Sequence, residues 1–494
     1  MAAPAQRGFF GHPRALSTLF FTEMWERLSY YGMRALLVLF LVDSVNEGGF
    51  GLDDRTATAI YGLYTAGVYL AGLPGGWIAD RLLGSQTAVL IGGLVIALGH
   101  VLLGLSGTPA VFYFGLLVIV LGTGLLKPNI SALVGTLYPE GGARCDAGYT
   151  IFYLGVNLGG LFGPLMTATL AQRYGWHIGF LAAAVGMALG VGQFVRTRRH
   201  LGTAGLHPHS RSGVTGSSRG DWLIFTLTAT MLLVVILLVW AGIVPISPVA
   251  LQGGAINVIV AMAAAYFLYL LCFAGLDGVE RRRVLVLLVL FIASSVFWAG
   301  FEQAGSSLNL FAERHTDRLI GSFEIPSGWF QSLNSTFIIL CAPLLSALWV
   351  LLARRGRNVP VAIKFVCGLL GMAVGFLVMA AASKIVADGE MAGPVWLTLT
   401  YFFHTLGELC LSPVGMSATT KLAPQRFVGQ SMGVWFVSLS LGNLIASRIA
   451  GDFDASNVAA MPGQYMAIFW FGAVAALTLL LLSPLVKRWT GGVE

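Results

Sequence analysis

Charged residues are scarce in this chain of 494 amino acids: they make up 10% of it, against about 25% in a soluble domain. Apolar residues supply 56%, and the mean hydropathy is +0.80. The net charge of +7 does not indicate a nucleic-acid partner, because the basic residues lie in short loops between apolar runs. The composition predicts an all-α polytopic membrane protein that lies in a lipid bilayer.

The chain also lacks the motifs of common enzymes and metal proteins. Its five cysteines show no Cys-x-x-Cys spacing, and neither Gly-x-Ser-x-Gly nor His-Glu-x-x-His occurs. We therefore predict no enzyme activity, no metal site and no cofactor. Met1 to Pro13 has no basic segment followed by an apolar run and a cleavage site, so we expect the first span to direct membrane insertion.

Runs of about 18 or more mostly apolar residues predict fourteen transmembrane helices. Six lie near 15–42, 56–82, 86–106, 110–135, 147–171 and 177–196. Two lie near 221–244 and 254–275, and six near 284–312, 328–353, 359–383, 394–420, 428–450 and 464–487. This spacing predicts a six-helix bundle (1–196), a basic cytoplasmic linker (197–220), an inserted two-helix hairpin (221–275) and a second six-helix bundle (276–494).

Arginines and lysines favour one orientation in the membrane. They cluster after the predicted spans six, eight and ten, at Arg196 to Arg199, Arg281 to Arg283 and Arg354 to Lys364, whereas the alternate loops are acidic or neutral. Because cytoplasmic loops carry excess positive charge, both termini are predicted to be cytoplasmic.

A weak internal repeat relates the two halves. Gly122-x-x-x-Leu-x-Pro128 recurs as Gly407-x-x-x-Leu-x-Pro413, and Asn157-Leu recurs as Asn443-Leu, at offsets of 285 and 286 residues. Six spans plus a two-helix insertion account for this offset. Parallel repeats of this kind build alternating-access transporters.

Four ionisable residues occupy the first apolar stretch, which runs from about Leu16 to Val42. A membrane span that keeps such charges is a candidate functional site. On a helix the polar face spans an arc of roughly 140° and carries Glu23, Glu26, Arg27, Tyr30, Tyr31 and Arg34. The alternative is a set of buried ion pairs that only fixes helix packing.

Three further ionisable residues, Lys127, Glu302 and Glu408, each stand alone in a later apolar span. With the first span, four acids then face three bases, so one carboxylate can take up a proton or bind an ammonium group. A ligand with both an amine and a carboxylate would fit between Glu408 on one side and Arg34 with Lys127 on the other. Alternatively, Glu408 and Lys127 are buried partners of one another.

Four uncharged residues in apolar helices complete the candidate site. Asn157 and Asn334 carry amides suited to a peptide-like group, although hydrogen bonds between helices would explain either one. Trp298 and Trp435 could wall a pocket for a variable side chain, or serve packing alone.

At six places the chain resembles the proton-coupled oligopeptide transporters, a branch of the major facilitator superfamily. The likeness in the first half rests on EMWERLSYYG (23–32), GGWIADR (75–81) and FYLGVNLG (152–159). In the second half it rests on FEQ (301–303), FQSLN (330–334) and GELCLSP (407–413). The hairpin is similar to one found in bacterial members.

The resemblance implies the major facilitator fold and inward symport of di- and tripeptides driven by the proton gradient across a bacterial inner membrane. It implies proton coupling by Glu23, Glu26, Arg27 and Glu302, the last pairing with Lys127 in one state. Arg34 and Lys127 would bind the peptide carboxylate and Glu408 its amine. The residues implied to line the peptide or its side-chain pockets are Tyr30, Tyr31, Tyr69, Asn157, Asn334, Trp298 and Trp435.

Two departures limit this transfer. Leu28 stands where the family usually has phenylalanine, and the span 57–82 has no histidine of the kind that some members use. We expect a monomer whose partners are small peptides and protons. The alternative is a proton-coupled transporter of a non-peptide anion or zwitterion, such as nitrate or an amino-acid derivative; an inorganic anion would have no use for Glu408. A passive channel or receptor would show uptake that does not depend on the proton gradient.

Overall fold

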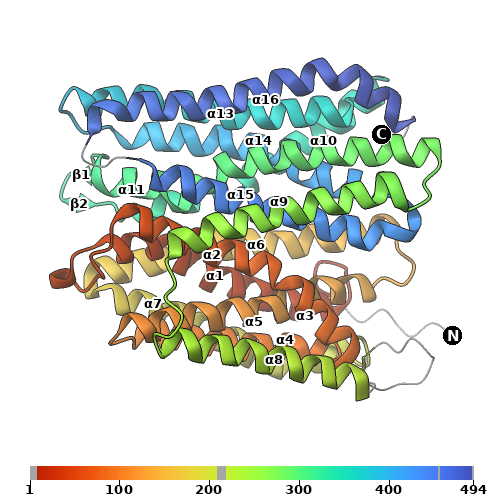
Figure 1. Cartoon of the computed structure of the whole chain (residues 1–494), viewed down its shortest axis with the longest axis horizontal. Coiled ribbons are helices and arrows are strands. Elements are labelled where there is room, and N and C mark those ends of the chain that lie inside the picture. The colour runs from red at the N-terminus through yellow and green to blue at the C-terminus, as the bar shows by residue number, and fades with distance from the viewer. Residues whose placement is uncertain (1–7, 209–218, 454–456, 492–494) are drawn as a thin grey trace. The chain divides into compact units, whose positions relative to one another are not determined.

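The computed structural model describes residues 8–208, 219–453 and 457–491, which are almost entirely helical (Figure 1). The first part of the chain forms α1 (Arg14–Val42), α2 (Asp54–Leu70), α3 (Gly72–Ile78), α4 (Ser85–Gly104), α5 (Pro109–Thr136), α6 (Gly142–Tyr174) and α7 (Trp176–Thr197). Two helices follow, α8 (Arg219–Trp240) and α9 (Pro248–Phe273).

The last part of the chain forms α10 (Gly278–Phe301), α11 (Ser307–Arg314), α12 (Ser332–Arg354), α13 (Val361–Ala387), α14 (Pro394–Leu422), α15 (Val428–Gly451) and α16 (Met461–Thr490). Between α11 and α12, β1 (Leu319–Ile320) pairs antiparallel with β2 (Phe323–Glu324). Short helical turns are η1 (Val45–Glu47), η2 (Ala79–Leu83), η3 (Arg198–Leu201), η4 (Glu302–Gly305), η5 (Ser327–Gln331), η6 (Gln425–Phe427) and η7 (Val458–Ala460).

Eleven helical segments among the described residues are long and apolar enough to cross a membrane. The predicted fold class, an all-α polytopic membrane protein, is thereby confirmed. The other three predicted spans are also helical: α1 carries five charged residues, α2 has 17 residues, and α14 carries Glu408 and Lys421.

Two predicted spans are interrupted. The span 56–82 divides into α2, α3 and the π-helical turn η2, and the span 284–312 divides into α10, η4 and α11. The second interruption begins at Glu302. Irregular backbone at membrane depth occurs where it is buried in protein or lines a cavity.

Local sequence signals explain where several helices begin. The Asp277 carboxylate accepts hydrogen bonds from the amides of Val279 and Glu280, and the Glu280 carboxylate accepts one from the Asp277 amide, which makes a capping box for α10. The Thr108 hydroxyl accepts from the amide of Val111, and Pro109 takes the first position of α5, where no amide donor is needed.

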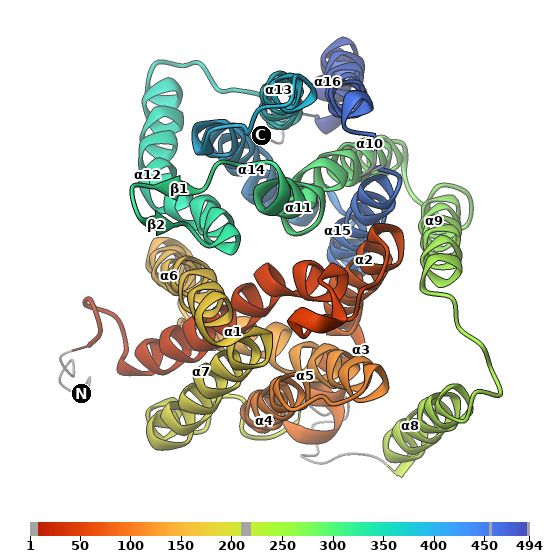
Figure 2. The same cartoon turned by 90° about the vertical axis from the view of Figure 1, so that its left-hand side faces the viewer.

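The chain divides into two compact units. We call 1–40, 44–50 and 67–247 the N-terminal unit, and 41–43, 51–66 and 248–494 the C-terminal unit. In the N-terminal unit α4 packs on α5 and α7, and α6 packs on α7. In the C-terminal unit α13 lies beside α14 and α16, and α10 packs on α15 (Figures 1 and 2).

The repeated motifs occupy equivalent places in the two units. Pro128 lies inside α5 and Pro413 inside α14. A Cβ at Gly122 would come within 2.8 Å of the Gly92 carbonyl oxygen in α4, and one at Gly407 within 2.6 Å of the Gly368 carbonyl oxygen in α13. Small residues at these crossings let the backbones approach closely.

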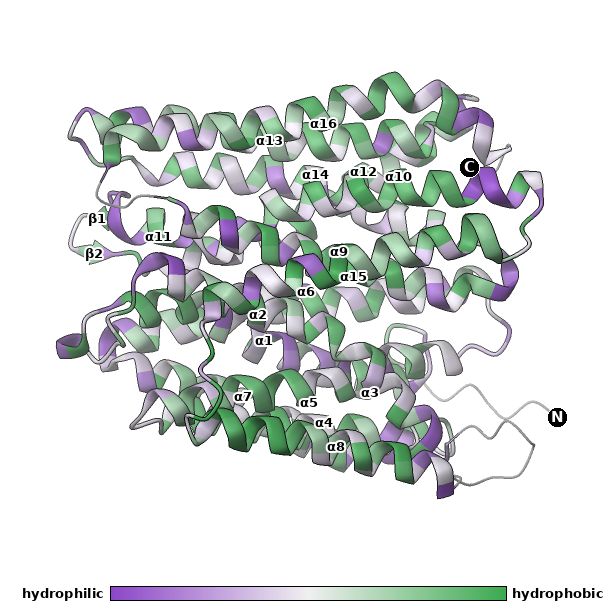
Figure 3. Ribbon diagram, viewed as in Figure 1, coloured by the Kyte–Doolittle hydropathy of each residue, from purple (hydrophilic) through white to green (hydrophobic). Residues whose placement is uncertain are grey.

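The two hairpin helices differ in their surroundings. No residue of α8 is buried, and most of the helix consists of hydrophobic residues (Figure 3). In contrast, α9 is bonded to α15, because Gln252 Nε2 lies 2.6 Å from Ser447 Oγ and the Tyr266 hydroxyl 3.1 Å from Ser431 Oγ. α8 belongs to the N-terminal unit and α9 to the C-terminal unit. The four predicted segments stay a prediction, and residues 209–218 of the predicted linker lie outside the described residues.

Candidate functional site

Two carboxylates share one guanidinium in the middle of α1. Arg27 Nε lies 3.2 Å from Glu23 Oε1 and also donates a hydrogen bond to Glu26 Oε2. All three residues are at least 97% buried. Glu23 Oε2, Glu26 Oε1 and Arg27 Nη2 have no hydrogen-bond partner within the described residues. This group holds two acids for one base, and its remaining polar atoms are available to a proton, water or ligand.

Glycines in α6 bring a second helix against this charged stretch. A Cβ at Gly159 would overlap the carbonyl oxygen of Met24, and one at Gly163 would overlap that of Leu28. Both glycines follow Asn157 by a few residues. Any larger side chain at these positions would push α6 away from α1 at the level of Arg27.

Aromatic rings surround the cations of the N-terminal unit. The Arg27 guanidinium lies 4.9 Å from the ring centre of Tyr30, and that of Arg34 lies 6.0 Å from Tyr31. Lys127 Nζ in α5 lies 4.3 Å from the ring centre of Tyr69. Such contacts stabilise a positive charge where water is excluded.

Lys127 also interacts electrostatically with Glu23, so α5 and α1 contribute to the same charged group. The structure thus brings together eight predicted residues of the N-terminal unit: Glu23, Glu26, Arg27, Tyr30, Tyr31, Arg34, Tyr69 and Lys127. Asn157, a ninth, donates from Nδ2 to the Tyr153 carbonyl oxygen of its own helix at 2.9 Å. Its side-chain oxygen is the group left for a further contact.

Glu408 is held by a neighbouring amide in the C-terminal unit. Asn334 Nδ2 in α12 lies 2.9 Å from Glu408 Oε2 and 3.1 Å from Thr405 Oγ1, both in α14. The Thr405 hydroxyl donates to the Tyr401 carbonyl oxygen at 2.7 Å. Glu408 and Asn334 are partly exposed, which suits a carboxylate that meets a ligand.

Glu302 and Trp298 lie one helical turn apart at the end of α10. Glu302 is 3% exposed and starts the interruption η4. Trp298 packs against Gly442 of α15, where a Cβ would overlap it, and its ring contacts Phe301 edge to face at 5.2 Å. The Trp298 Nε1 donor is buried and lacks a partner in the described part of the chain.

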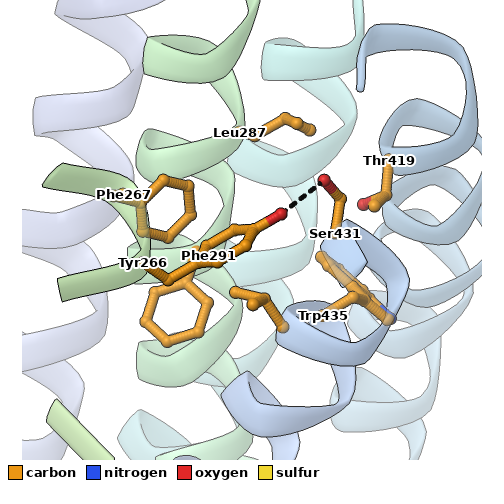
Figure 4. Close-up of a pocket in the computed structure, with 8 residues that line it drawn as sticks. Tyr266, Phe267, Leu287, Phe291, Thr419, Ser431 and Trp435 are labelled. Atoms are coloured by element: carbon orange, nitrogen blue, oxygen red, sulfur yellow. Dashed lines mark hydrogen bonds between the residues drawn. The ribbon is translucent and has the colours of Figure 1, made fainter. Parts of the chain in front are cut away.

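Trp435 lies beside the hairpin helix. Its indole covers Gly415 of α14, where a side chain would overlap it, and it lines a cavity together with Tyr266 of α9 and Phe291 of α10 (Figure 4). The cavity has a volume of about 20 Å³, room for about one water molecule. The ring therefore braces the packing of α14, α15 and α9.

Two features of the site were missed in the sequence. Thr405 fixes Asn334 toward Glu408, and Gly159 with Gly163 sets the distance between α1 and α6. Gly159 is the last residue of the motif at 152–159, but a sequence motif does not show which helix a residue packs against. Thr405 gave no signal, since a hydroxyl one turn before an acid is common in apolar helices.

The charges define what the site can do. The Arg27 guanidinium can balance one of its two carboxylates, and the other depends on Lys127 or on a proton for its neutralisation. No group of three or more His, Cys, Asp or Glu able to hold a metal ion occurs among the described residues. Buried acidic and basic side chains inside the spans of a helical membrane protein are typical of ion-coupled transporters.

The comparisons with known proteins agree with this class. A family model described as the POT family matches residues 86–471. The peptide transporter YePEPT of Yersinia enterocolitica is 42% identical over 98% of this chain and 96% of its own length. The di-/tripeptide transporter of Lactococcus lactis subsp. cremoris is 35% identical, with 99% of both chains covered. A crystal structure of a variant of peptide transporter POT in complex with alafosfalin has a TM-score of 0.90 and 40% identity, covering 98% of this chain and 97% of that one.

The chain belongs to the POT family of transporters. The predicted family and its major facilitator fold are confirmed.

Proposed function

We propose that this protein carries out proton-coupled symport of di- and tripeptides into the cell by alternating access. The observation that carries the proposal is the buried group of Glu23, Glu26 and Arg27, in which two acids share one base. Such a group changes between a neutral and a negative state by taking up or releasing one proton. Uptake or release of this proton is therefore coupled to any ligand binding or conformational change that alters the surroundings of the three residues.

The proposed ligand is a short peptide with free ends. Glu408, oriented by Asn334, binds the amine, and Arg34 with Lys127 binds the carboxylate. Tyr30, Tyr31, Tyr69 and Asn157 line the peptide, and Trp298 and Trp435 border its side chains. The names of the relatives and the partly exposed Glu408 support this assignment.

The proposed proton carriers are Glu23 and Glu26 with Arg27 in the N-terminal unit, and Glu302 in the C-terminal unit. Burial of Glu302 to 3% exposure supports its role, because an ionisable side chain kept inside a membrane span marks a candidate proton site. The protein makes and breaks no covalent bond in the peptide and uses no cofactor besides the proton.

The proposed setting is the bacterial inner membrane, with both termini in the cytoplasm and the protein active as a monomer within the lipid bilayer. Basic residues support this topology, since they gather at the end of α7, the start of α10 and the end of α12.

Uptake of labelled dialanine into liposomes tests the function. We expect accumulation above the external concentration when the lumen is more alkaline than the medium, and only equilibration without the pH difference. Absence of dialanine uptake or competition would favour a non-peptide substrate, and uptake that ignores the pH difference would favour a passive channel.

A further inference from the structure

The interruption between α10 and α11 is a buried polar segment. Gln303, Ser306 and Ser307 are each at least 95% buried, and Ser306 adopts a non-helical backbone with φ −125° and ψ −99°. Tyr401 in α14 donates to the Ala304 carbonyl oxygen at 3.3 Å. Polar groups at this depth need partners, since no lipid group can supply them.

A column of hydrogen-bonded side chains, formed by Gln303, Ser307 and Tyr465, extends from this interruption. The Ser307 hydroxyl donates to Gln303 Oε1, and Ser307 is also hydrogen-bonded to the Tyr465 hydroxyl in α16. At its inner end, Gln303 Nε2 is fully buried with no partner among residues that the structure describes. An unpaired buried donor marks a place for a water molecule. Gln303 directly follows Glu302.

A small cavity continues the column at its other end. Ser307 and Tyr465 line it together with Asp54, Arg314 and His315, and its volume is about 30 Å³. A site this polar and this large holds at least one water molecule. Arg314 binds Asp54 through two parallel hydrogen bonds of 2.6 and 2.8 Å, and its side chain is 32% exposed. The column thus connects a partly exposed ion pair with the residue beside Glu302.

We infer that this column is a proton-access path to Glu302 that lies within the C-terminal unit. A proton arrives at cavity water beside the Asp54 and Arg314 pair, which faces outward on the proposed topology. The Tyr465 and Ser307 hydroxyls pass it on, each accepting one proton as it gives up its own. Gln303 Oε1 accepts the proton from Ser307 while Nε2 releases one to the buried water, which delivers a proton to the Glu302 carboxylate. Only O–H and N–H bonds are made or broken, and return of a proton from Oε1 to Nε2 restores the Gln303 amide. The inference rests on the proposed role of Glu302.

The test is Tyr465→Phe, which removes one hydroxyl and keeps the ring. Tyr401→Phe is the matched control, because its hydroxyl binds the same interruption but does not line the cavity. Both are compared in liposomes by proton-driven dialanine uptake and by dialanine counterflow, which needs no net proton movement. We expect Tyr465→Phe to slow driven uptake on the order of a hundredfold while counterflow stays near wild type. Tyr401→Phe should leave both unchanged.

Ser307 gives a second, independent arm. Ser307→Ala should reproduce the selective loss of driven uptake, and Ser307→Thr, which keeps the hydroxyl, should restore it. Equal behaviour of Tyr465→Phe and Tyr401→Phe would overturn the path. So would loss of counterflow in both Tyr465→Phe and Ser307→Ala, since that indicates a structural role alone. If wild-type dialanine uptake does not depend on the pH difference, the proposed function itself is contradicted, and not only the proton-access path.

Discussion

Asn334 holds the carboxylate of Glu408: its Nδ2 lies 2.9 Å from Glu408 Oε2 and 3.1 Å from the hydroxyl oxygen of Thr405. One amide therefore ties α12 to α14 and fixes the acid that we assign to the peptide amine. The geometry makes Asn334 a positioning residue as well as a candidate peptide contact.

Asn334→Ala should weaken dipeptide binding about tenfold, because a hydrogen bond to a charged group contributes roughly 1.5–3 kcal/mol. In a Glu408→Gln background, Asn334→Ala should reduce dipeptide affinity only slightly, since there is no carboxylate left to orient. Competition against labelled dialanine measures all four proteins of this cycle. Equal losses of dipeptide affinity in both backgrounds would show that Asn334 acts without Glu408. Thr405→Ser, which keeps the hydroxyl, serves as the control.

Glu408→Gln should weaken binding of free peptides more than that of N-acylated analogues, which lack the charged amine. The same competition assay measures this difference. A loss of the same size for both kinds of ligand would remove Glu408 as the amine partner.

Glu23→Gln should abolish concentrative uptake but leave peptide exchange at least partly intact, because the buried group can no longer change charge at this position. Glu140 supplies a matched control, since it also precedes its arginine partner by four residues. Its pair with Arg144 spans 3.9 Å with both side chains more than half exposed, and such surface pairs contribute about 0–1 kcal/mol. Concentrative uptake should survive in Glu140→Gln and fail in Glu23→Gln; survival in both would contradict a coupling role for Glu23.

Gly159→Ala should disturb the charged stretch of α1, because the added methyl group overlaps the Met24 carbonyl oxygen. Overpacking of this kind costs about 1–3 kcal/mol, which should lower the apparent melting temperature in detergent. Gly192→Ala in α7 is the control, since nothing lies within 4 Å of its Cβ position. The close packing of α1 on α6 would be in doubt if the two variants melted alike.

Asp53 should stabilise the start of α2 in a pH-dependent way. The backbone amide and hydroxyl of Thr56 donate to its carboxylate at 2.9 and 2.7 Å, and these bonds hold the Asp53 pKa below its usual 3.8. A lowered pKa in the folded state means that the stabilisation is present above pH 3.8 and is lost as the pH falls through the folded-state pKa.

Asp53→Ala should therefore cost about 1 kcal/mol of folding free energy near pH 7, as is typical for a lost helix cap, and less near pH 3. Melting temperatures at both pH values measure this difference. Asp53→Asn keeps an oxygen acceptor and should lose less at pH 7. A cost for Asp53→Ala that does not change with pH would show that the carboxylate charge contributes nothing.

The sequence predicted the charged face of the first span because charges in apolar runs stand out, and helical spacing alone places Glu23, Glu26, Arg27 and Arg34 on one side. The fourteen spans followed from hydropathy for the same reason. Neither signal depends on which helices become neighbours.

The interruption at Glu302 was not predicted, since the run 284–312 stays apolar on average. Its small polar residues, Gly305 to Ser307, were the signal that could have indicated it. The contact of Trp435 with Gly415 could not be predicted either, because helical periodicity shows which face of a helix carries a side chain but not which helix packs against that face. Bonds such as Gln252 to Ser447 join residues nearly 200 positions apart and leave no local pattern.

The most direct test of peptide and proton coupling is a flux measurement without any initial pH difference. Liposomes that contain the protein and a lumenal pH dye, with the membrane potential clamped, are given an inward dialanine gradient. We expect dialanine influx to acidify the lumen, and Glu23→Gln to admit dialanine by exchange without this acidification. Dialanine influx through the wild-type protein with no change of lumenal pH would contradict proton-coupled symport.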